Sequence, residues 1–249
     1  MITIPAGYSR SITVSQALTE GLRHRNAQQP SQDSVLLRAA GDFLFCGIAD
    51  GQSGTRYGAE GGRACLEAVF EYLESAGPDS LIHGPFPDEL PCMVVRSYRQ
   101  RLIQLSRQYG ADFKEFASTL LVIVANLRTG EYLLLHLGDG CAISIPRAGE
   151  PAILSGPDTG LTACHTWLTT SDHAVNHLRV RFGSLENKKR LLILSDGATC
   201  FCRGTNILWR TKELLKNGTS AQLRDRLLQS APIDDAACLI LDLAGEDNS

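Results

Sequence analysis

Five aspartates stand where polar loops meet apolar runs of strand length. Three of them follow such a run and precede a glycine, and two come just before one. In order, they are Asp33, Asp50, Asp139, Asp196 and Asp234. Taken singly, each is typical of a turn or a cap. Their repetition suggests that the ends of several strands bring carboxylates to a common place.

Carboxylates gathered in this way would repel one another strongly unless they were protonated or bound to cations. Oxygen ligands suit Mg²⁺ or Mn²⁺, whereas zinc would call for histidine or cysteine at ligand spacing, which His24 and His136 do not supply. Two such ions about 3.5–4 Å apart lower the pKa of a bridging water and orient it for attack on phosphorus. The aspartates therefore indicate hydrolysis of a phosphoester without a protein nucleophile.

The elements that would position these side chains follow from hydrophobic periodicity and turn residues. We expect strands at residues 12–14, 34–38, 43–49, 120–124, 132–137, 141–145, 152–154, 175–182, 190–194 and 236–243. We expect helices from about residue 57 to 73 and at 95–109, 209–215 and 221–228. The remaining segments are predicted loops: residues 22–32, which lead to Asp33, a Pro/Gly-rich connector at 77–91, and an irregular loop at 156–176 that could cover a site.

Composition excludes several classes of protein. The chain has 249 residues, 43% of them hydrophobic, and a net charge of -3 without a Lys/Arg-rich block, which argues against a nucleic-acid partner. No apolar run reaches the ~18–20 residues that span a bilayer, and the first residues do not resemble a secretion signal. Eight cysteines without a CxxC pair are expected to be thiols in a reducing compartment. We expect one soluble, cytoplasmic domain over residues 1–249, a monomer without membrane or nucleic-acid contacts.

The order of short motifs resembles that of the protein phosphatase 2C family, the metal-dependent Ser/Thr phosphatases. The motifs are Gln32-Asp33-Ser34, Ala49-Asp50-Gly51, Ser118-Thr119-Leu120, Leu137-Gly138-Asp139-Gly140, Leu194-Ser195-Asp196-Gly197 and Asp234-Asp235-Ala236. The loop before Asp33 and the Asp-Gly-Gln-Ser stretch are most similar to a divergent bacterial branch of the family. The resemblance implies an α+β fold, a four-layer αββα sandwich in which two antiparallel β-sheets are flanked by helix pairs.

The resemblance also implies roles for individual residues. Asp50 would bridge two central Mn²⁺ or Mg²⁺ ions, and the carbonyl group of Gly51 would complete the ligands of one of them. Asp196 and Asp234 would bind the other ion, and Asp33 would act through a metal-bound water. Asp139 would hold a third ion together with Asp196. The predicted catalytic residues are Asp33, Asp50, Asp196 and Asp234, and Asp234 is preferred to Asp235 because the family's ligand comes first in the pair.

Two positions depart from the family pattern. The arginine that grips phosphate in the family corresponds to Gln28 here, so we predict that Arg25 binds the substrate, with Arg23 and His24 as alternatives. Gln52 replaces a histidine that follows the Asp-Gly pair in many eukaryotic members, and water could serve as the acid instead.

We therefore expect a phosphoprotein phosphatase that hydrolyses phospho-Ser and phospho-Thr, acting on a phosphorylated protein and opposing a cognate Ser/Thr kinase. The missing arginine motivates an alternative, a catalytically weak relative that serves as a regulatory or binding module. In a third interpretation, the aspartates are ordinary turn residues and no metal binds.

Overall fold

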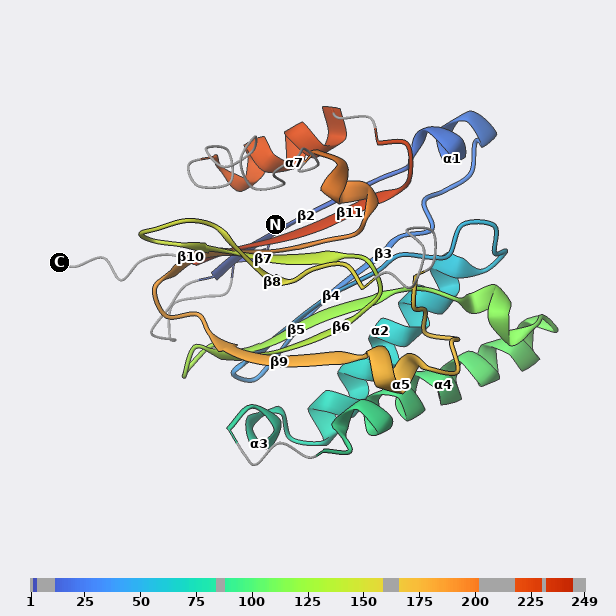
Figure 1. Cartoon of the computed structure of the whole chain (residues 1–249), viewed down its shortest axis with the longest axis horizontal. Helices are drawn as coiled ribbons and strands as arrows, with labels where there is room; N and C mark the ends of the chain where they lie inside the picture. The colour runs from blue at the N-terminus through green and yellow to red at the C-terminus, as the bar shows by residue number, and fades with distance from the viewer. Residues whose placement is uncertain are drawn as a thin grey trace.

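Two antiparallel sheets lie face to face in the computed structural model, which describes residues 2–3, 12–83, 88–158, 166–201, 218–229 and 232–243 (Figure 1). The larger sheet runs in the order β1 (Ile2–Thr3), β2 (Ile12–Thr19), β11 (Ala236–Leu243), β10 (Lys188–Leu194), β7 (Cys141–Pro146) and β8 (Ala152–Ser155). The smaller sheet runs β3 (Ser34–Ala40), β4 (Phe43–Ala49), β5 (Leu120–Asn126), β6 (Glu131–Leu137) and β9 (Arg179–Ser184). The predicted pair of antiparallel sheets is confirmed.

Helices cover the outer faces of both sheets. On the smaller sheet these are α2 (Gly58–Ser75) and α4 (Leu90–Tyr109), with α3 (Pro78–His83) and α5 (Ala174–His177) beside them. On the larger sheet α7 (Ser220–Gln229) packs over β2 and β11, next to the short helix η2 (Gly197–Phe201). The four-layer αββα order is therefore as predicted. The expected helix at 209–215 lies outside the described residues.

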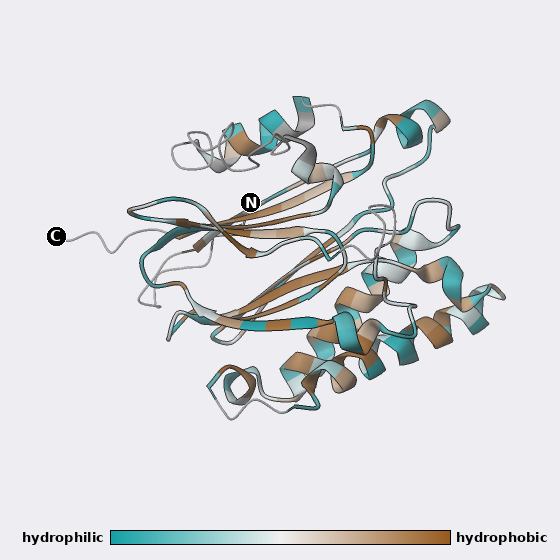
Figure 2. Cartoon of the chain, viewed as in Figure 1, coloured by the Kyte–Doolittle hydropathy of each residue, from teal (hydrophilic) through white to brown (hydrophobic). Residues whose placement is uncertain are grey.

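Successive side chains of a strand point to opposite faces of its sheet, and apolar side chains on these faces form three buried layers. In β10, Leu191 and Ile193 are buried between the two sheets, whereas Leu192 and Leu194 belong to the cluster under α7 that includes Leu223. A third cluster fills the space between the smaller sheet and helices α2 and α4. Figure 2 shows apolar residues on the strands and on the inner sides of these helices. Because residues 191–194 of β10 are buried on both faces, this half of the strand is a continuous apolar run.

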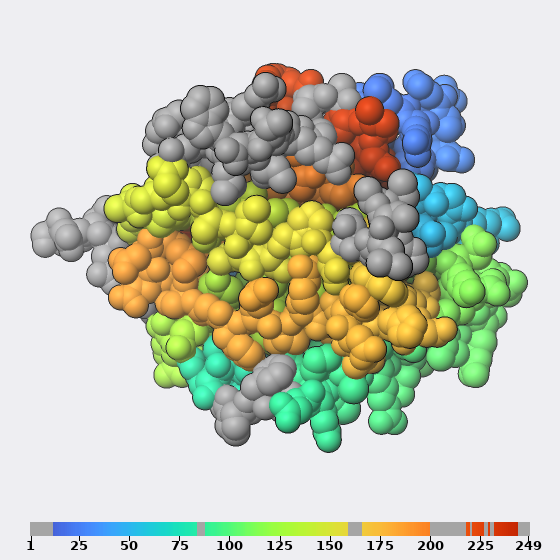
Figure 3. Space-filling model, viewed as in Figure 1, coloured from blue at the N-terminus to red at the C-terminus, as the bar shows by residue number. Residues whose placement is uncertain are grey.

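Three predicted segments differ from the structure. The connector at 77–91 was expected as a loop but contains α3 and the start of α4. Residues 22–32 were expected as a loop but begin with the helix α1 (Leu22–Ala27), which buries none of its own residues and so lacks the apolar periodicity of a packed helix. Residues 175–182 were expected as one strand, but the chain first makes α5 and only then β9. Figure 3 shows this part of the chain in orange, on the surface between the β7–β8 hairpin and the helices of the smaller sheet.

No helix within the described ranges has the length and apolar character needed to cross a membrane. Four cysteines, Cys46, Cys65, Cys141 and Cys238, are buried free thiols, as predicted, whereas the thiol Cys92 is exposed. Of the predicted thiols, the side chains of Cys164, Cys200 and Cys202 lie outside the described part of the chain.

Helix α2 approaches the short helix η1 (Phe113–Phe116) so closely that a side chain at Gly61 has no room. A Cβ atom there would lie 2.1 Å from the carbonyl oxygen of Phe116, whereas a Cβ atom at Gly62 would lie 3.0 Å from Ala49 Cβ. Alanine usually stabilises a helix relative to glycine. We nevertheless expect Gly61→Ala to lower the free energy of unfolding by about 1–3 kcal/mol, because the added methyl group would overpack this contact.

Gly62→Ala, one residue along the same helix, is the matched control and should cost less. Urea denaturation of the two variants measures the difference. Equal or higher stability of Gly61→Ala would contradict the close approach of α2 and η1.

Candidate active site

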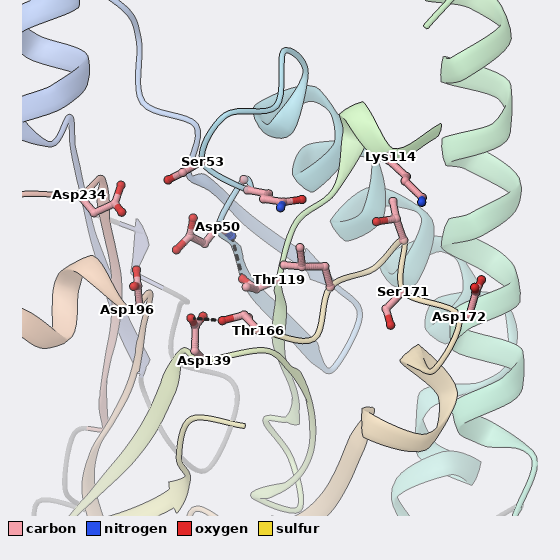
Figure 4. Close-up of a pocket in the computed structure, with 14 residues that line it drawn as sticks. Asp50, Ser53, Lys114, Thr119, Asp139, Thr166, Ser171, Asp172, Asp196 and Asp234 are labelled. Carbon is pink, nitrogen blue, oxygen red and sulfur yellow. Dashed lines mark hydrogen bonds between the residues drawn. The ribbon is translucent and has the colours of Figure 1, made fainter. Parts of the chain in front are cut away.

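A pocket of about 540 Å³ opens at one edge of the sandwich and is lined by four of the five predicted aspartates. Asp50 follows β4, Asp139 lies between β6 and β7, Asp196 follows β10, and Asp234 precedes β11. Figure 4 shows their carboxylates pointing toward a shared space. Gly51 also lines this pocket. Strand ends from both sheets thus bring together residues that are far apart in the sequence.

Asp33 lies behind the pocket wall and is only 3% exposed. Burial raises the pKa of its carboxyl group to about 7, and interactions with Ser195 and Asp50 offset part of the rise. Both carboxylate oxygens are buried, and neither has a partner at hydrogen-bonding geometry among the described residues. A buried carboxylate left in this way is expected to interact with a group that protein side chains do not provide, such as water or a cation.

Asp50 and Asp196 interact directly through their carboxyl groups. Burial raises the pKa of Asp50 well above its ordinary value, and the negative charges of Asp33 and Asp196 add to the rise. Burial also raises the pKa of Asp196, with further contributions from Asp139 and Asp234. Without a cation, therefore, these carboxyl groups retain protons at a pH where an exposed aspartate has lost its own.

Hydrogen bonds hold the loops that carry Asp50 and Asp139. The Thr119 hydroxyl oxygen accepts from the backbone N–H of Asp50 at 3.0 Å, and the Thr119 N–H donates to the Asp50 carbonyl at 2.8 Å. The hydroxyl group of Thr166 donates to Asp139 Oδ2 at 2.6 Å. Thr166 belongs to the segment predicted as an irregular loop over the site, and the described part of that segment lines the pocket through five residues. They are Thr166, Leu168, Thr170, Ser171 and Asp172.

Asp234 and Asp235 have different surroundings although they are neighbours. Asp235 is 3% exposed and its carboxylate accepts hydrogen bonds from the backbone N–H groups of Gly21 at 2.8 Å and Gln32 at 2.6 Å. Its carboxylate also lies 2.8 Å from Nδ1 of His24. Asp235 therefore fastens the α1 segment to the start of β11, while Asp234 faces the pocket.

The loops that carry Asp196 and Asp235 touch through their backbones. A Cβ atom at Gly197 would lie 1.8 Å from the carbonyl oxygen of Asp235, so only glycine allows this contact. The Leu-Ser-Asp-Gly motif thus needs its glycine so that its backbone can approach the backbone at Asp235.

The residues present fit hard divalent cations. Every titratable candidate ligand is a carboxylate, and the buried oxygens of Asp33 lack partners. Within the described residues, no three His, Cys, Asp or Glu side chains are grouped closely enough to bind one ion by themselves. In proteins, Mg²⁺ usually keeps several waters and takes only one or two carboxylates directly.

Arg25 is exposed on α1 and does not line the pocket. Its predicted role in binding the substrate thus has no support from the pocket geometry. Sequence reasoning missed Lys114 of η1, which does line the pocket, and it missed Asp172. Lys114 belongs to no motif and gave no signal, whereas Asp172 lies in a segment already expected to cover the site.

The sequence model of the protein phosphatase 2C family matches residues 20–231, so the chain belongs to this family. No curated protein matches it. Among solved structures, it resembles a bacterial serine phosphatase at 14% identity and a TM-score of 0.65, over 96% of this chain and 100% of the other.

Two further structures have the same fold. One is RsbX in complex with magnesium, at 15% identity and a TM-score of 0.60, over 98% of this chain and 99% of the other. The second is the catalytic domain of the serine/threonine protein phosphatase PstP in complex with two manganese ions, at 17% identity and a TM-score of 0.62, over 94% of this chain and 99% of the other.

The raised pKa of Asp33 predicts how the stability of the metal-free protein depends on pH. The folded state binds this proton more tightly than the unfolded state, so the free energy of unfolding falls as the pH rises from about 4 to about 7 and then levels off. We expect Asp33→Asn to remove this loss, with a stabilising effect that grows over the same pH window to a few kcal/mol.

Urea denaturation in the presence of a chelator, at intervals from pH 4 to pH 8, measures this difference between wild type and variant. Asp172→Asn, which changes an exposed aspartate of the same pocket, is the control. A constant difference for Asp33→Asn would contradict the buried, uncompensated state of Asp33.

Proposed function

We propose that this protein is a metal-dependent phosphoprotein phosphatase that hydrolyses phospho-Ser and phospho-Thr. One observation carries the proposal: in a chain of the protein phosphatase 2C family, Asp50, Asp139, Asp196 and Asp234 converge on one pocket. Magnesium in the RsbX structure and manganese in the PstP structure support the choice of cation. The substrate would be a phosphorylated protein, and a Ser/Thr kinase would oppose the reaction.

Asp50, with the carbonyl group of Gly51, would hold ions at the centre of the pocket, and Asp196 and Asp234 would complete the site from the larger sheet. Asp139, together with Asp196, would hold a third ion. When bound, Mg²⁺ or Mn²⁺ supplies the positive charge that acidifies a water and neutralises the phosphoryl oxygens. Asp33, behind this layer, would orient water through its unpartnered oxygens. Because both sheets contribute ligands, we treat residues 1–249 as one phosphatase domain.

The neighbours of each carboxylate determine what it can do. Thr119 fixes the backbone at Asp50, and Thr166 fixes one oxygen of Asp139, which leaves the other oxygen to face the pocket. Asp235 is already saturated by hydrogen bonds from the α1 segment and from Gln32, so it has a structural role. The reaction therefore depends on Asp50 and Asp196, whose carboxyl groups are adjacent.

A phosphatase assay with an aryl phosphate and with a phosphopeptide, each with and without Mn²⁺, tests the proposal. We expect turnover that requires the metal and falls at least about 100-fold in Asp50→Asn and Asp196→Asn, since the lost charge stabilisation amounts to several kcal/mol.

Asp172→Asn changes an aspartate that lines the same pocket but belongs to no motif, and it should have a much smaller effect. If the wild-type protein binds Mn²⁺ in calorimetry but shows no turnover on either substrate, the regulatory or binding module becomes the better description. Equal losses in all three variants would contradict the assigned roles.

A further inference from the structure

Lys114 lines the pocket on the wall opposite the cluster of carboxylates. It is the only lysine, arginine or histidine among the described residues that line the pocket. Figure 4 shows it together with Ser171 and Asp172 on the wall away from Asp139, Asp196 and Asp234. The pocket thus has an acidic half and an opposite half on which Lys114 places a positive charge, next to Asp172.

We infer that Lys114 binds the phosphoryl group of the substrate and takes the place of the arginine that Gln28 replaces. This inference rests on the proposed function, because it concerns the same pocket. A phosphate monoester carries up to two negative charges, and lysine is a compact cation that binds phosphate as a point charge. Cations bound by the aspartates on one side and Lys114 on the other would together enclose a phosphoryl group.

The backbone beneath Lys114 is rigid. Asp112 caps η1, and its Oδ1 atom accepts from the Lys114 N–H at 2.8 Å. The carbonyl group of Lys114 accepts from the Ala117 N–H at 3.2 Å. Phe116, in the same turn, is fully buried and stacks on Tyr57 with ring centroids 5.2 Å apart. Only the side chain of Lys114 would therefore lose freedom when it binds a ligand.

Hydrogen bonds also fix the position of η1 relative to Asp50. The loop that leaves Asp50 donates to η1 and the residue after it, from Gln52 N–H to the Ala117 carbonyl at 2.9 Å and from Tyr57 N–H to the Glu115 carbonyl at 3.1 Å. The Arg56 N–H donates to Glu115 Oε2 at 2.8 Å. The backbone of η1, which carries Lys114, is thus fixed relative to the loop that follows Asp50.

The other nearby cations are placed or engaged elsewhere. His24 contacts Asp235, and the guanidinium group of Arg56 lies over the ring of Tyr57, 5.2 Å from its centroid. Arg25 is exposed on α1 and does not line the pocket. Arg23, the remaining alternative, is also exposed on α1 and does not line the pocket, so the structure favours Lys114 over all three.

The test compares Lys114→Met, Lys114→Arg and Arg25→Met with the wild type, and Arg107→Met removes an exposed charge from α4 as the control. Inorganic phosphate is titrated into each protein in excess Mg²⁺ by calorimetry, and Mn²⁺ is titrated separately. We expect Lys114→Met to weaken phosphate binding about tenfold or more, because a hydrogen bond to a charged group is lost. Lys114→Arg should restore most of the affinity, and Mn²⁺ affinity should stay unchanged.

In the phosphatase assay, we expect the inhibition constant for phosphate and KM for the phosphopeptide to rise by a similar factor in Lys114→Met alone. A wild type that lacks turnover but binds phosphate through Lys114 would overturn the proposed function and leave this inference standing. The inference is overturned if phosphate affinity is unchanged in Lys114→Met, if only Arg25→Met weakens it, or if Lys114→Met loses Mn²⁺ affinity as well.

Discussion

Burial of several carboxylates close to one another is the constraint on which this structure depends. Asp33, Asp50 and Asp196 each have a raised pKa, and in each case burial is the largest cause. A protein that needed these residues only as turns would leave them in water, where they cost nothing. Burying these carboxylates close together lowers the stability of the metal-free protein, and binding of a dication can offset this cost. The same carboxylates thus destabilise the metal-free fold and attract the metal.

The two sheets share the task of building the site. The smaller sheet provides Asp50 from the end of β4, and the larger sheet provides Asp196 and Asp234 from the ends of β10 and β11. Asp139 lies where the chain crosses from one sheet to the other, between β6 and β7. Because apolar side chains fill the space between the sheets, core packing fixes the strand ends that carry these aspartates relative to one another.

Much of this arrangement could be predicted from the sequence, for local reasons. Asp50 and Asp196 each end an apolar run that can only be a buried strand, and the glycine after each marks the turn. The α1 helix could not be predicted in this way, because its anchor is Asp235, more than two hundred positions away. Lys114 could not be predicted either, for a related reason. A lysine in a short helical turn belongs to no sequence motif, and only the tertiary structure places it at the pocket.

The contacts of Asp235 with Gly21, His24 and Gln32 have a consequence for folding. Its contact with His24 joins positions separated by 211 residues, so it can form only after nearly the whole polypeptide has been synthesised. Contacts that close such large loops are entropically costly and tend to arise late. Asp235 also accepts a hydrogen bond from the backbone N–H of Gln32, the neighbour of Asp33, so the position of Asp33 depends on a residue at the start of the last strand. A chain that ended before Asp234 would therefore lack one carboxylate of the pocket and also the contacts that hold the segment before Asp33.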